Sequence, residues 1–443
     1  MKVSFVLWFG MCISFGCKTD RIKSISDADR SNVHTLSNQE EAFYDWEITS
    51  EKKLTAGLVY KAYSFIHFNQ HIHTLELDLT EQRLSLETVI ANDICPNPNA
   101  NGNKNNGKNL RETLSETCNR RRKEGHSIIA GINTGFFDSN DGFPRGICVE
   151  DDEPVFVNNP DVRQRLVNHL SGFTLFDDGS ISFDKRSFHG QIKMDDETYE
   201  FFSINDTIVR LNGKSAYDLN VYTNRYVKNP HEGIVNPIGS KALFIVAKNN
   251  EGTLTVNGGY QQAKILDIRD GRNQDIDAPY VSAKDEWVLQ ITGTMADEMM
   301  KKIHIGGNIS IKTTIAIGSR TDGIKIHNAS MYHYVQAGDY VAPPKEVDAL
   351  KIYQTTNMGL SADRKKMILF CVDGKTAADR GLDFYEAFRV AKKLGLVDVI
   401  RFDGGGSSTM WIYENGTGKI MNRLSDKNGE RSCMNYLHIR LNE

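Results

Sequence analysis

Alternating apolar and polar residues predict strands over much of the chain. Segments 73–79 and 83–90 both alternate in this way, so we expect two strands joined by a turn. From about 172 to 317, short alternating runs recur with turn signals such as Asp178-Gly179, and little helical periodicity is sustained. This middle region is therefore expected to be mostly strand.

Two segments have the spacing of apolar positions that is typical of a helix. The first, 110–124, ends in a basic run, where cations meet the negative end of the helix dipole. The short apolar run 127–132 follows it and suits a buried strand. The second helix begins with a capping box formed by Asp383 and Glu386 and is stopped by Gly395.

This second helix lies between two apolar runs, 367–372 and 397–402. A strand–helix–strand unit usually forms a right-handed parallel crossover, in which both strands end at the same edge of the sheet. Asp373 and Asp403 follow the two strands, so we expect two carboxylates beside one crevice. The fold class predicted is α+β (mixed α/β), a mixed β-sheet core flanked by helices, with this unit leading into a glycine-rich loop.

The N-terminal residues indicate export. Residues 1–17 have one lysine, an apolar run and small residues before Cys17, as in a signal peptide. The end of this segment is similar to a bacterial lipobox, in which the cysteine is acylated; plain secretion is the alternative. The polar segment 18–50 suits a tether, and 51–443 the folded domain. We expect a lipid-anchored protein of the bacterial cell envelope, either periplasmic or at the cell surface.

The composition limits the partners. With 40% hydrophobic and 25% charged residues, the 443 residues could form one large domain or two. A net charge of -4 leaves no basic excess for a phosphate backbone, so nucleic acid is not expected as a partner. The Asn-rich loop between Cys95 and Cys118 could be closed by a disulfide.

No metal site or cofactor is predicted. The chain has no short Cys-x-x-Cys spacing of a structural zinc site. His67, His71 and His73 cluster, but their spacing fits a strand-rich region as well as a metal site, and no carboxylate partner is evident.

The segment 401–409 carries most of the chemical information. Three consecutive glycines, 404–406, allow positive φ and close ligand approach, so backbone N–H groups could converge on an anion. Hydroxyl groups follow at 407–409, and Asp403 supplies a carboxylate at a strand end. The alternative is a tight glycine hairpin whose serines satisfy backbone groups. Other polar residues at strand ends, 133–138, 373–374 and 422–426, favour a functional site.

Asp403 to Thr409 are similar to the Asp-Gly-Gly-Gly-Ser-Ser-Thr signature of the phosphodiester glycosidase family. Segment 130–138 resembles the family's Asn-Gly-x-Phe-Phe segment, with Thr134 in place of glycine, and 422–431 resembles its closing segment, with Leu424 in place of proline. The resemblance covers roughly 54–443 and is weak between 172 and 317. The family usually has an arginine in a Pro-Arg-Thr context where this chain has Tyr353-Gln354-Thr355.

The resemblance and the chemistry of the residues suggest roles. Asp403 and Asp373 are candidates for nucleophile or base; Asp138 is a third candidate, although an aspartate after a strand often caps a turn. If the missing arginine holds phosphate in the family, Arg320, Arg401, Arg423 or Arg431 replaces it, or the substrate differs. The candidate substrate-binding residues are Asn133, Gly404, Gly405, Gly406, Ser407, Ser408, Thr409, Arg320, Asn422, Arg423 and Arg431.

The function this implies is an exported hydrolase, a glycosidase that cleaves a sugar-1-phosphodiester of the N-acetylglucosamine type in a glycan or glycoconjugate. Its partners would be that carbohydrate substrate and, through the lipid anchor, a membrane. Two alternatives remain open: a metal-dependent phosphodiesterase, and a surface glycan-binding lipoprotein without catalysis.

Overall fold

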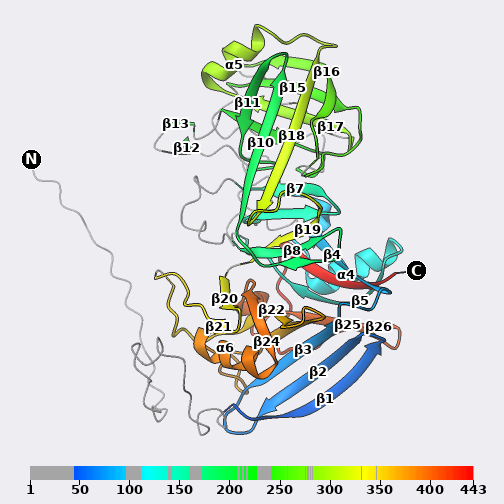
Figure 1. The fold of residues 1–443 in the computed structure, drawn as a ribbon, viewed down its shortest axis with the longest axis vertical. Coiled ribbons are helices and arrows are strands. Elements are labelled where there is room, and N and C mark those ends of the chain that lie inside the picture. The colour runs from blue at the N-terminus through cyan, green and yellow to red at the C-terminus, as the bar shows by residue number, and fades with distance from the viewer. Residues whose placement is uncertain are drawn as a thin grey trace, which may run out of the picture.

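The protein is built from stacked antiparallel sheets (Figure 1). The computed structural model describes residues 44–95, 111–137, 142–158, 171–206, 210–211, 214–215, 218–226, 241–256, 258–274, 276, 279, 281, 283–330, 332–345 and 347–442. Residues 1–17, most of the predicted tether, the loop 96–109 and Asp138 lie outside this part of the chain. Strand β1 begins at Trp46, so regular structure starts inside the segment 18–50 that was expected to be a tether.

An eight-stranded sheet forms one end of the molecule, at the bottom of Figure 1. One of its faces packs on a neighbouring five-stranded sheet, described next, through a large apolar cluster. Helix α6 (Phe384–Lys393) covers the other face. In spatial order its strands are β1 (Trp46–Thr55), β2 (Leu58–Phe65), β3 (His71–Asp78), β23 (Lys366–Val372), β22 (Thr355–Ser361), β24 (Leu396–Arg401), β20 (Tyr332–Gln336) and β21 (Asp339–Tyr340).

Two five-stranded sheets occupy the middle. The sheet that contacts the eight-stranded one has the order β26 (Thr417–Ile420), β25 (Met410–Glu414), β5 (Ser127–Asn133), β27 (Asn435–Leu441) and β4 (Leu84–Ile90). The other has the order β7 (Glu153–Val157), β6 (Ile147–Glu150), β19 (Ile324–Ala329), β8 (Gly172–Phe176) and β9 (Ile181–Ser182).

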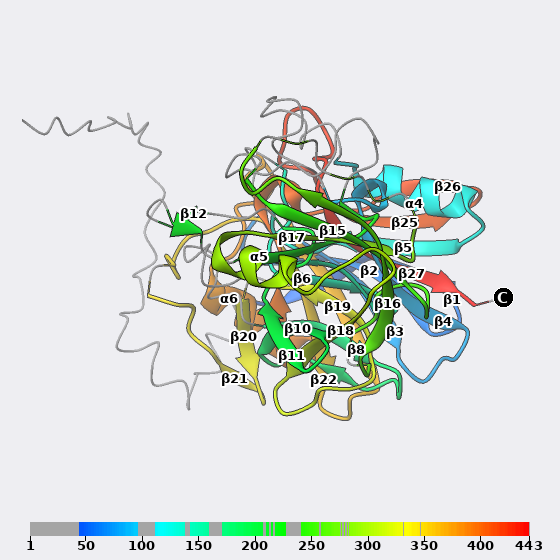
Figure 2. The ribbon, with the colours of Figure 1, turned by 90° about the horizontal axis from the view of Figure 1, so that it is seen from above.

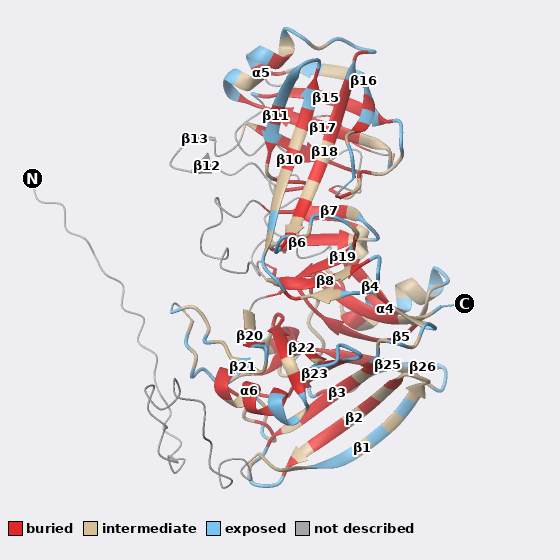
Figure 3. Ribbon diagram, in the orientation of Figure 1, coloured by how far each residue is buried: buried red, intermediate tan, exposed pale blue. Residues whose placement is uncertain are grey.

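A seven-stranded sheet forms the far end and lies over the other sheets in Figure 2. Its order is β11 (Glu197–Phe201), β10 (Arg186–Met194), β18 (Asn308–Ile317), β16 (Gln261–Asp270), β15 (Leu243–Asn249), β17 (Glu286–Ile291) and β14 (Leu219–Tyr222). A two-stranded ribbon, β12 (Arg210–Leu211) and β13 (Lys214–Ser215), completes the described strands. Buried residues run through all these layers, whereas edge strand β1 is largely exposed (Figure 3).

Three α-helices are present in the described part of the chain. The capping box predicted at Asp383 is confirmed: its side chain accepts from the Glu386 N–H, and Glu386 reaches back to the Asp383 N–H. Thr113 and Glu116 form a second capping box. The helices are α4 (Leu114–Lys123), α5 (Gly293–Met300) and α6 (Phe384–Lys393), and none is long and apolar enough to cross a membrane.

The predicted α+β (mixed α/β) class is wrong, because the protein is mostly β-sheet and every pairing between named strands is antiparallel. Strands β23 and β24 do run in the same direction, as the crossover argument required, but β22 lies between them and pairs with both. The parallel crossover applies only to the unit β23–α6–β24, and the strand pairs of the sheets are antiparallel.

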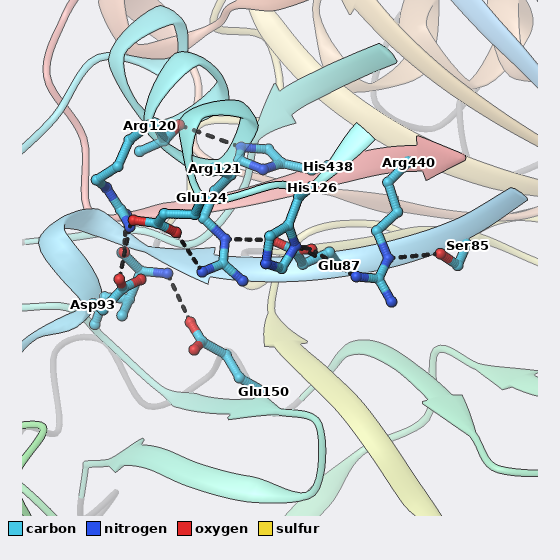
Figure 4. A network of polar contacts seen from close by, with 12 residues as sticks. Ser85, Glu87, Asp93, Arg120, Arg121, Glu124, His126, Glu150, His438 and Arg440 are labelled. Carbon is cyan, nitrogen blue, oxygen red and sulfur yellow. Dashed lines mark hydrogen bonds and ion pairs between the residues drawn. The ribbon is translucent and has the colours of Figure 1, made fainter. Parts of the chain in front are cut away.

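Ion pairs connect α4 and the residues after it to the sheet that contains β4 and β5 (Figure 4). Arg121 Nε lies 2.6 Å from Glu87 Oε1, and the other oxygen of Glu87 is 2.7 Å from His126 Nδ1. Arg120 Nη1 lies 2.6 Å from Asp93 Oδ2. Helix α4 packs directly on β5, so these ion pairs help to fix the strand that ends at the candidate site.

The predicted disulfide between Cys95 and Cys118 is not formed. All five described cysteines are buried and free. The thiol of Cys95 lies 3.5 Å from the Val155 carbonyl, whereas Cys118 packs on β5 beside Gly131. The two side chains therefore have different neighbours in the core.

Candidate active site

The side chain of Asn133, the last residue of β5, joins the ends of several strands. Its Nδ2 donates to the backbone carbonyl of Asp403 at 2.9 Å. Its Oδ1 accepts from Thr356 Oγ1 at 2.6 Å and from the Thr409 N–H at 3.0 Å. The side-chain amide is buried, and both its nitrogen and its oxygen form hydrogen bonds. Asn133 therefore supports the loop that follows β24.

Asp373 directly follows β23 and is connected to the same glycine loop through Arg423 and Gln354. Its Oδ1 accepts from the Arg423 N–H at 3.1 Å, and its Oδ2 lies 3.1 Å from His73 Nε2. Gln354 connects this group to the glycine loop: its side-chain Nε2 donates to the Arg423 backbone carbonyl at 2.8 Å, and its backbone carbonyl accepts from the Gly405 N–H at 2.9 Å. The predicted convergence of the three strand ends is therefore confirmed.

The Asp403 carboxyl is buried, with 8% of the residue exposed. Burial raises its pKa to about 6, because the ionised form loses water; Ser407 and the Gly404 N–H oppose this rise. The Gly404 N–H donates to Oδ1 at 3.0 Å. A carboxyl with such a pKa can take up or release a proton close to neutral pH.

A buried chain of polar contacts leads to Asp373. Tyr60 Oη lies 2.8 Å from His73 Nδ1, and the other ring nitrogen faces Asp373. Burial raises the pKa of the Asp373 carboxyl, and His73 opposes that rise. Because both ring nitrogens have partners, the orientation of the His73 ring is fixed. The interpretation that the histidines have no carboxylate partner is wrong for His73.

His71 also has a carboxylate partner, Asp379, so the interpretation that the histidines lack one is wrong for His71 as well. His71 Nδ1 lies 2.7 Å from Asp379 Oδ1, and Arg423 Nη1 lies 2.8 Å from Asp379 Oδ2. Although burial opposes the change, hydrogen bonds from Arg423, His71 and Thr376 hold the pKa of Asp379 below its ordinary value. Residues two apart on a strand share a face, and that spacing could have placed His71 beside His73.

The glycine loop is not an open nest of N–H groups. Gly405 has φ +62 and begins a short 3₁₀ turn, Gly405–Ser407. Five N–H groups of the loop already donate to protein acceptors, so the predicted anion cradle would have to come from other donors. The five residues are Gly404, Gly405, Ser407, Ser408 and Thr409.

An ion pair covers the loop at Gly406. Arg431 binds Asp426 through two parallel contacts, Nε to Oδ2 at 2.7 Å and Nη2 to Oδ1 at 2.9 Å. A Cβ at Gly406 would collide with both side chains, so glycine is needed here for close packing. Arg431 thus lies at the predicted site.

Asn422 holds the other end of the loop. Its Oδ1 accepts from the Met410 N–H at 2.7 Å, and its Nδ2 donates to the Ser408 carbonyl at 2.9 Å. Both contacts are to the backbone and the side chain is buried. In this structure Asn422 supports the loop and the start of β25.

Arg320 does not join this cluster. It lies in the turn between β18 and β19, where its Nη1 is 3.0 Å from Asp178 Oδ2 and its guanidinium carbon is 3.8 Å from the Phe176 ring centroid. These partners belong to the β8–β9 region, so the prediction that Arg320 contributes to the site is not supported by its contacts.

Arg401, at the end of β24, is the most enclosed of the four arginines. Only 2% of it is exposed, and its guanidinium carbon lies 4.0 Å from the Tyr353 ring centroid and 4.5 Å from that of Phe384. Its Nε and Nη2 are buried and have no hydrogen-bond partner in the part of the chain that the structure describes. Burial lowers the pKa of the Arg401 guanidinium.

Within the described ranges, no group of three or more histidine, cysteine, aspartate or glutamate side chains is arranged to hold a metal ion.

Comparison with known proteins identifies the part of the chain that carries this site. Residues 304–440 match the phosphodiester glycosidase family. The predicted resemblance is thereby confirmed for the segment that holds Asp373, Asp403 and Arg431. No match was found among curated proteins.

The matched segment is part of a larger fold that is similar to two solved structures. A hypothetical protein from Synechocystis aligns with a TM-score of 0.63 and 13% identity, over 89% of this chain and 64% of its own length. A protein from Burkholderia pseudomallei, described as exported, aligns with a TM-score of 0.59 and 16% identity, over 84% and 74%. The chain therefore spans less than two thirds of the Synechocystis protein.

A third structure is the catalytic domain of zebrafish N-acetylglucosamine-1-phosphodiester alpha-N-acetylglucosaminidase. It aligns over 90% of this chain and 82% of its own length at 13% identity, with a TM-score of 0.34. A score this low does not support an argument from the shared fold.

Proposed function

We propose that the protein is a glycosidase that hydrolyses a sugar-1-phosphodiester, with an N-acetylglucosamine-type sugar, in a glycan or glycoconjugate. The family match of residues 304–440 supports the reaction class. The observation that carries the proposal is the buried carboxyl of Asp403, whose pKa is about 6, at the meeting point of three strand ends.

Asp403 is the residue to which we assign the chemistry. Cleavage of the bond between C1 and oxygen passes through an oxocarbenium-like transition state, which a carboxylate stabilises as nucleophile or as base. Above pH about 6 the Asp403 carboxyl is ionised and can serve in either role. The phosphate monoester that departs needs little help from an acid, because cationic donors can stabilise its charge.

We assign Asp373 to positioning. Both of its oxygens are occupied, one by the Arg423 N–H and the other by His73. A carboxylate held in this way is poorly placed to attack the sugar, but it fixes the segment that carries Arg423. This modifies the role as nucleophile or base that the sequence suggested.

We also propose export and a lipid anchor at Cys17, on the pattern of residues 1–17. Replacing Cys17 by alanine should abolish labelling with fatty acid and release the protein from membranes. Labelling that persists in the variant would exclude this cysteine as the site.

The direct test of Asp403 is the release of free N-acetylglucosamine from a synthetic N-acetylglucosamine-1-phosphodiester. Asp403→Asn keeps the shape and removes the charge, so turnover should fall by ~10²-fold or more. The matched control is Asp196→Asn, at an exposed turn between β10 and β11, which should retain activity. Full activity in Asp403→Asn would remove Asp403 from the mechanism, and binding without turnover in the wild type would favour the glycan-binding alternative.

A further inference from the structure

Arg401 carries a buried charge that no carboxylate in the described part of the chain contacts through a hydrogen bond, although Asp403 is near enough to interact with it electrostatically. Among the described residues its Nε and Nη2 have no acceptor, and its guanidinium carbon lies over the rings of Tyr353 and Phe384. An unpaired buried charge is costly, since it loses water and gains no counter-ion. Stacking on the two rings offsets part of that cost, but it satisfies none of the guanidinium's N–H groups.

The other three candidate arginines have carboxylate partners. Arg423 is 2.8 Å from Asp379, Arg431 is 2.7 Å from Asp426, and Arg320 is 3.0 Å from Asp178. A ligand anion would have to compete with these carboxylates. At Arg401 it would meet donors that are still unused.

The position of Arg401 relates it to the site. A Cβ built on Gly404 would lie 3.6 Å from Arg401 Nη2, so the guanidinium is beside the backbone that follows Asp403. Five N–H groups of this loop are already engaged within the protein. The loop's backbone therefore offers few free donors. Among the described residues its unpartnered side-chain groups are the hydroxyls of Ser407 and Ser408, and a guanidinium beside the loop adds two more N–H donors.

We propose that Arg401 binds the phosphoryl oxygens of the substrate, an inference that rests on the proposed function and names the group that holds the phosphate. The guanidinium fork matches two phosphoryl oxygens through parallel N–H bonds. The Tyr353 and Phe384 rings, 4.0 and 4.5 Å from the guanidinium carbon, restrict the movement of the fork. Arg401 thus acts as a substrate-binding residue, while Gln354 occupies the position where the family usually has its arginine.

The test separates ligand binding from a structural role. The melting temperature of the wild type, of Arg401→Met and of a control, Arg83→Met, is measured with rising inorganic phosphate and with rising N-acetylglucosamine 1-phosphate. Arg83 is an exposed residue paired with Glu81. Phosphate should raise the melting temperature of the wild type and of the control, because it binds the folded state.

Arg401→Met should lose this phosphate-dependent rise and, without phosphate, should melt at the same temperature as the wild type or higher, because an unpaired charge has been removed. The inference is overturned if the variant keeps the rise, if the wild type shows none with either ligand, or if the variant melts lower without phosphate. Should Arg401→Met not fold, Arg401→Lys keeps the charge without the fork and should bind phosphate about tenfold more weakly or worse. Equal affinity in Arg401→Lys would contradict the proposal.

Kinetics distinguish this inference from the proposed function. If Arg401→Met loses phosphate binding while the wild type hydrolyses no sugar-1-phosphodiester, the phosphate site stands and the proposed function fails. If the wild type hydrolyses the substrate and Arg401→Met does so with unchanged kcat and KM, the proposed function stands and the role of Arg401 fails.

Discussion

The amide nitrogen of Asn133 donates a 2.9 Å hydrogen bond to the backbone carbonyl of Asp403. Asn133 ends β5 in the five-stranded sheet, and Asp403 lies two residues after the end of β24 in the eight-stranded sheet. This contact fixes the two sheets against each other at the point where the buried carboxyl lies. The candidate site is thus formed by the packing of sheets, and it depends on residues 270 positions apart.

Asn133→Ala should destabilise the protein and lower its activity. The substitution removes three hydrogen bonds and leaves buried groups of Thr356, Thr409 and Asp403 without their partner. Each unsatisfied buried group costs about 1–3 kcal/mol, so the free energy of unfolding should fall by at least that amount. Urea denaturation measures the change, with the exposed Asn250→Ala as the control. An unfolding curve equal to the wild type would contradict the supporting role of Asn133.

The stability of the protein should depend on pH through Asp403. The carboxyl has an ordinary pKa of 3.8 and a folded-state pKa of about 6, so between these values the folded state holds a proton that the unfolded state has lost. Stability therefore falls as pH rises through this window, by about 1.4 kcal/mol for each unit of pKa difference.

The comparison with Asp403→Asn isolates this effect. The variant cannot ionise at that position, so its free energy of unfolding relative to the wild type should increase between pH about 4 and pH about 6 and then stay level. Urea denaturation of both proteins across this range measures the difference. A difference that is constant with pH would show that the pKa of Asp403 is not raised.

Two adjacent glycines of the loop should respond differently to alanine. At Gly405 a Cβ would meet open space, and only its φ of +62 is unfavourable, so Gly405→Ala should cost about 1 kcal/mol. At Gly406 a Cβ would collide with Arg431 and Asp426, so Gly406→Ala must displace the ion pair. Thermal unfolding and turnover should show the larger loss in Gly406→Ala. The reverse order would mean that the loop does not pack on this ion pair.

Local patterns predicted the unit around α6 well. The capping box at Asp383 and Glu386, the two flanking strands and their common direction are all set by residues close together in the sequence. Because Asp373 directly follows β23 and Asp403 lies two residues after β24, their approach could also be predicted. Asn133 was placed with them by the family resemblance.

The fold class could not be predicted in the same way, because it depends on which strands pair across long distances. Strand β22 pairs with both β23 and β24, and nothing in its own alternation indicates an insertion between two parallel strands. The pairing of His73 with Asp373 likewise follows from the contact between β3 and β23. Two of the loop's five engaged N–H groups, those of Gly405 and Thr409, donate to Gln354 and Asn133, which lie far away in the sequence.

The most direct test of the proposed function is hydrolysis of a sugar-1-phosphodiester in ¹⁸O-labelled water, with mass spectrometry of both products. The proposed glycosidase breaks the bond between the sugar's C1 and oxygen, so the label should appear on the anomeric oxygen of the released sugar and the phosphate should carry none. Label found in the phosphate and not in the sugar would mean attack at phosphorus, and the glycosidase assignment would be wrong even if Asp403 proved essential.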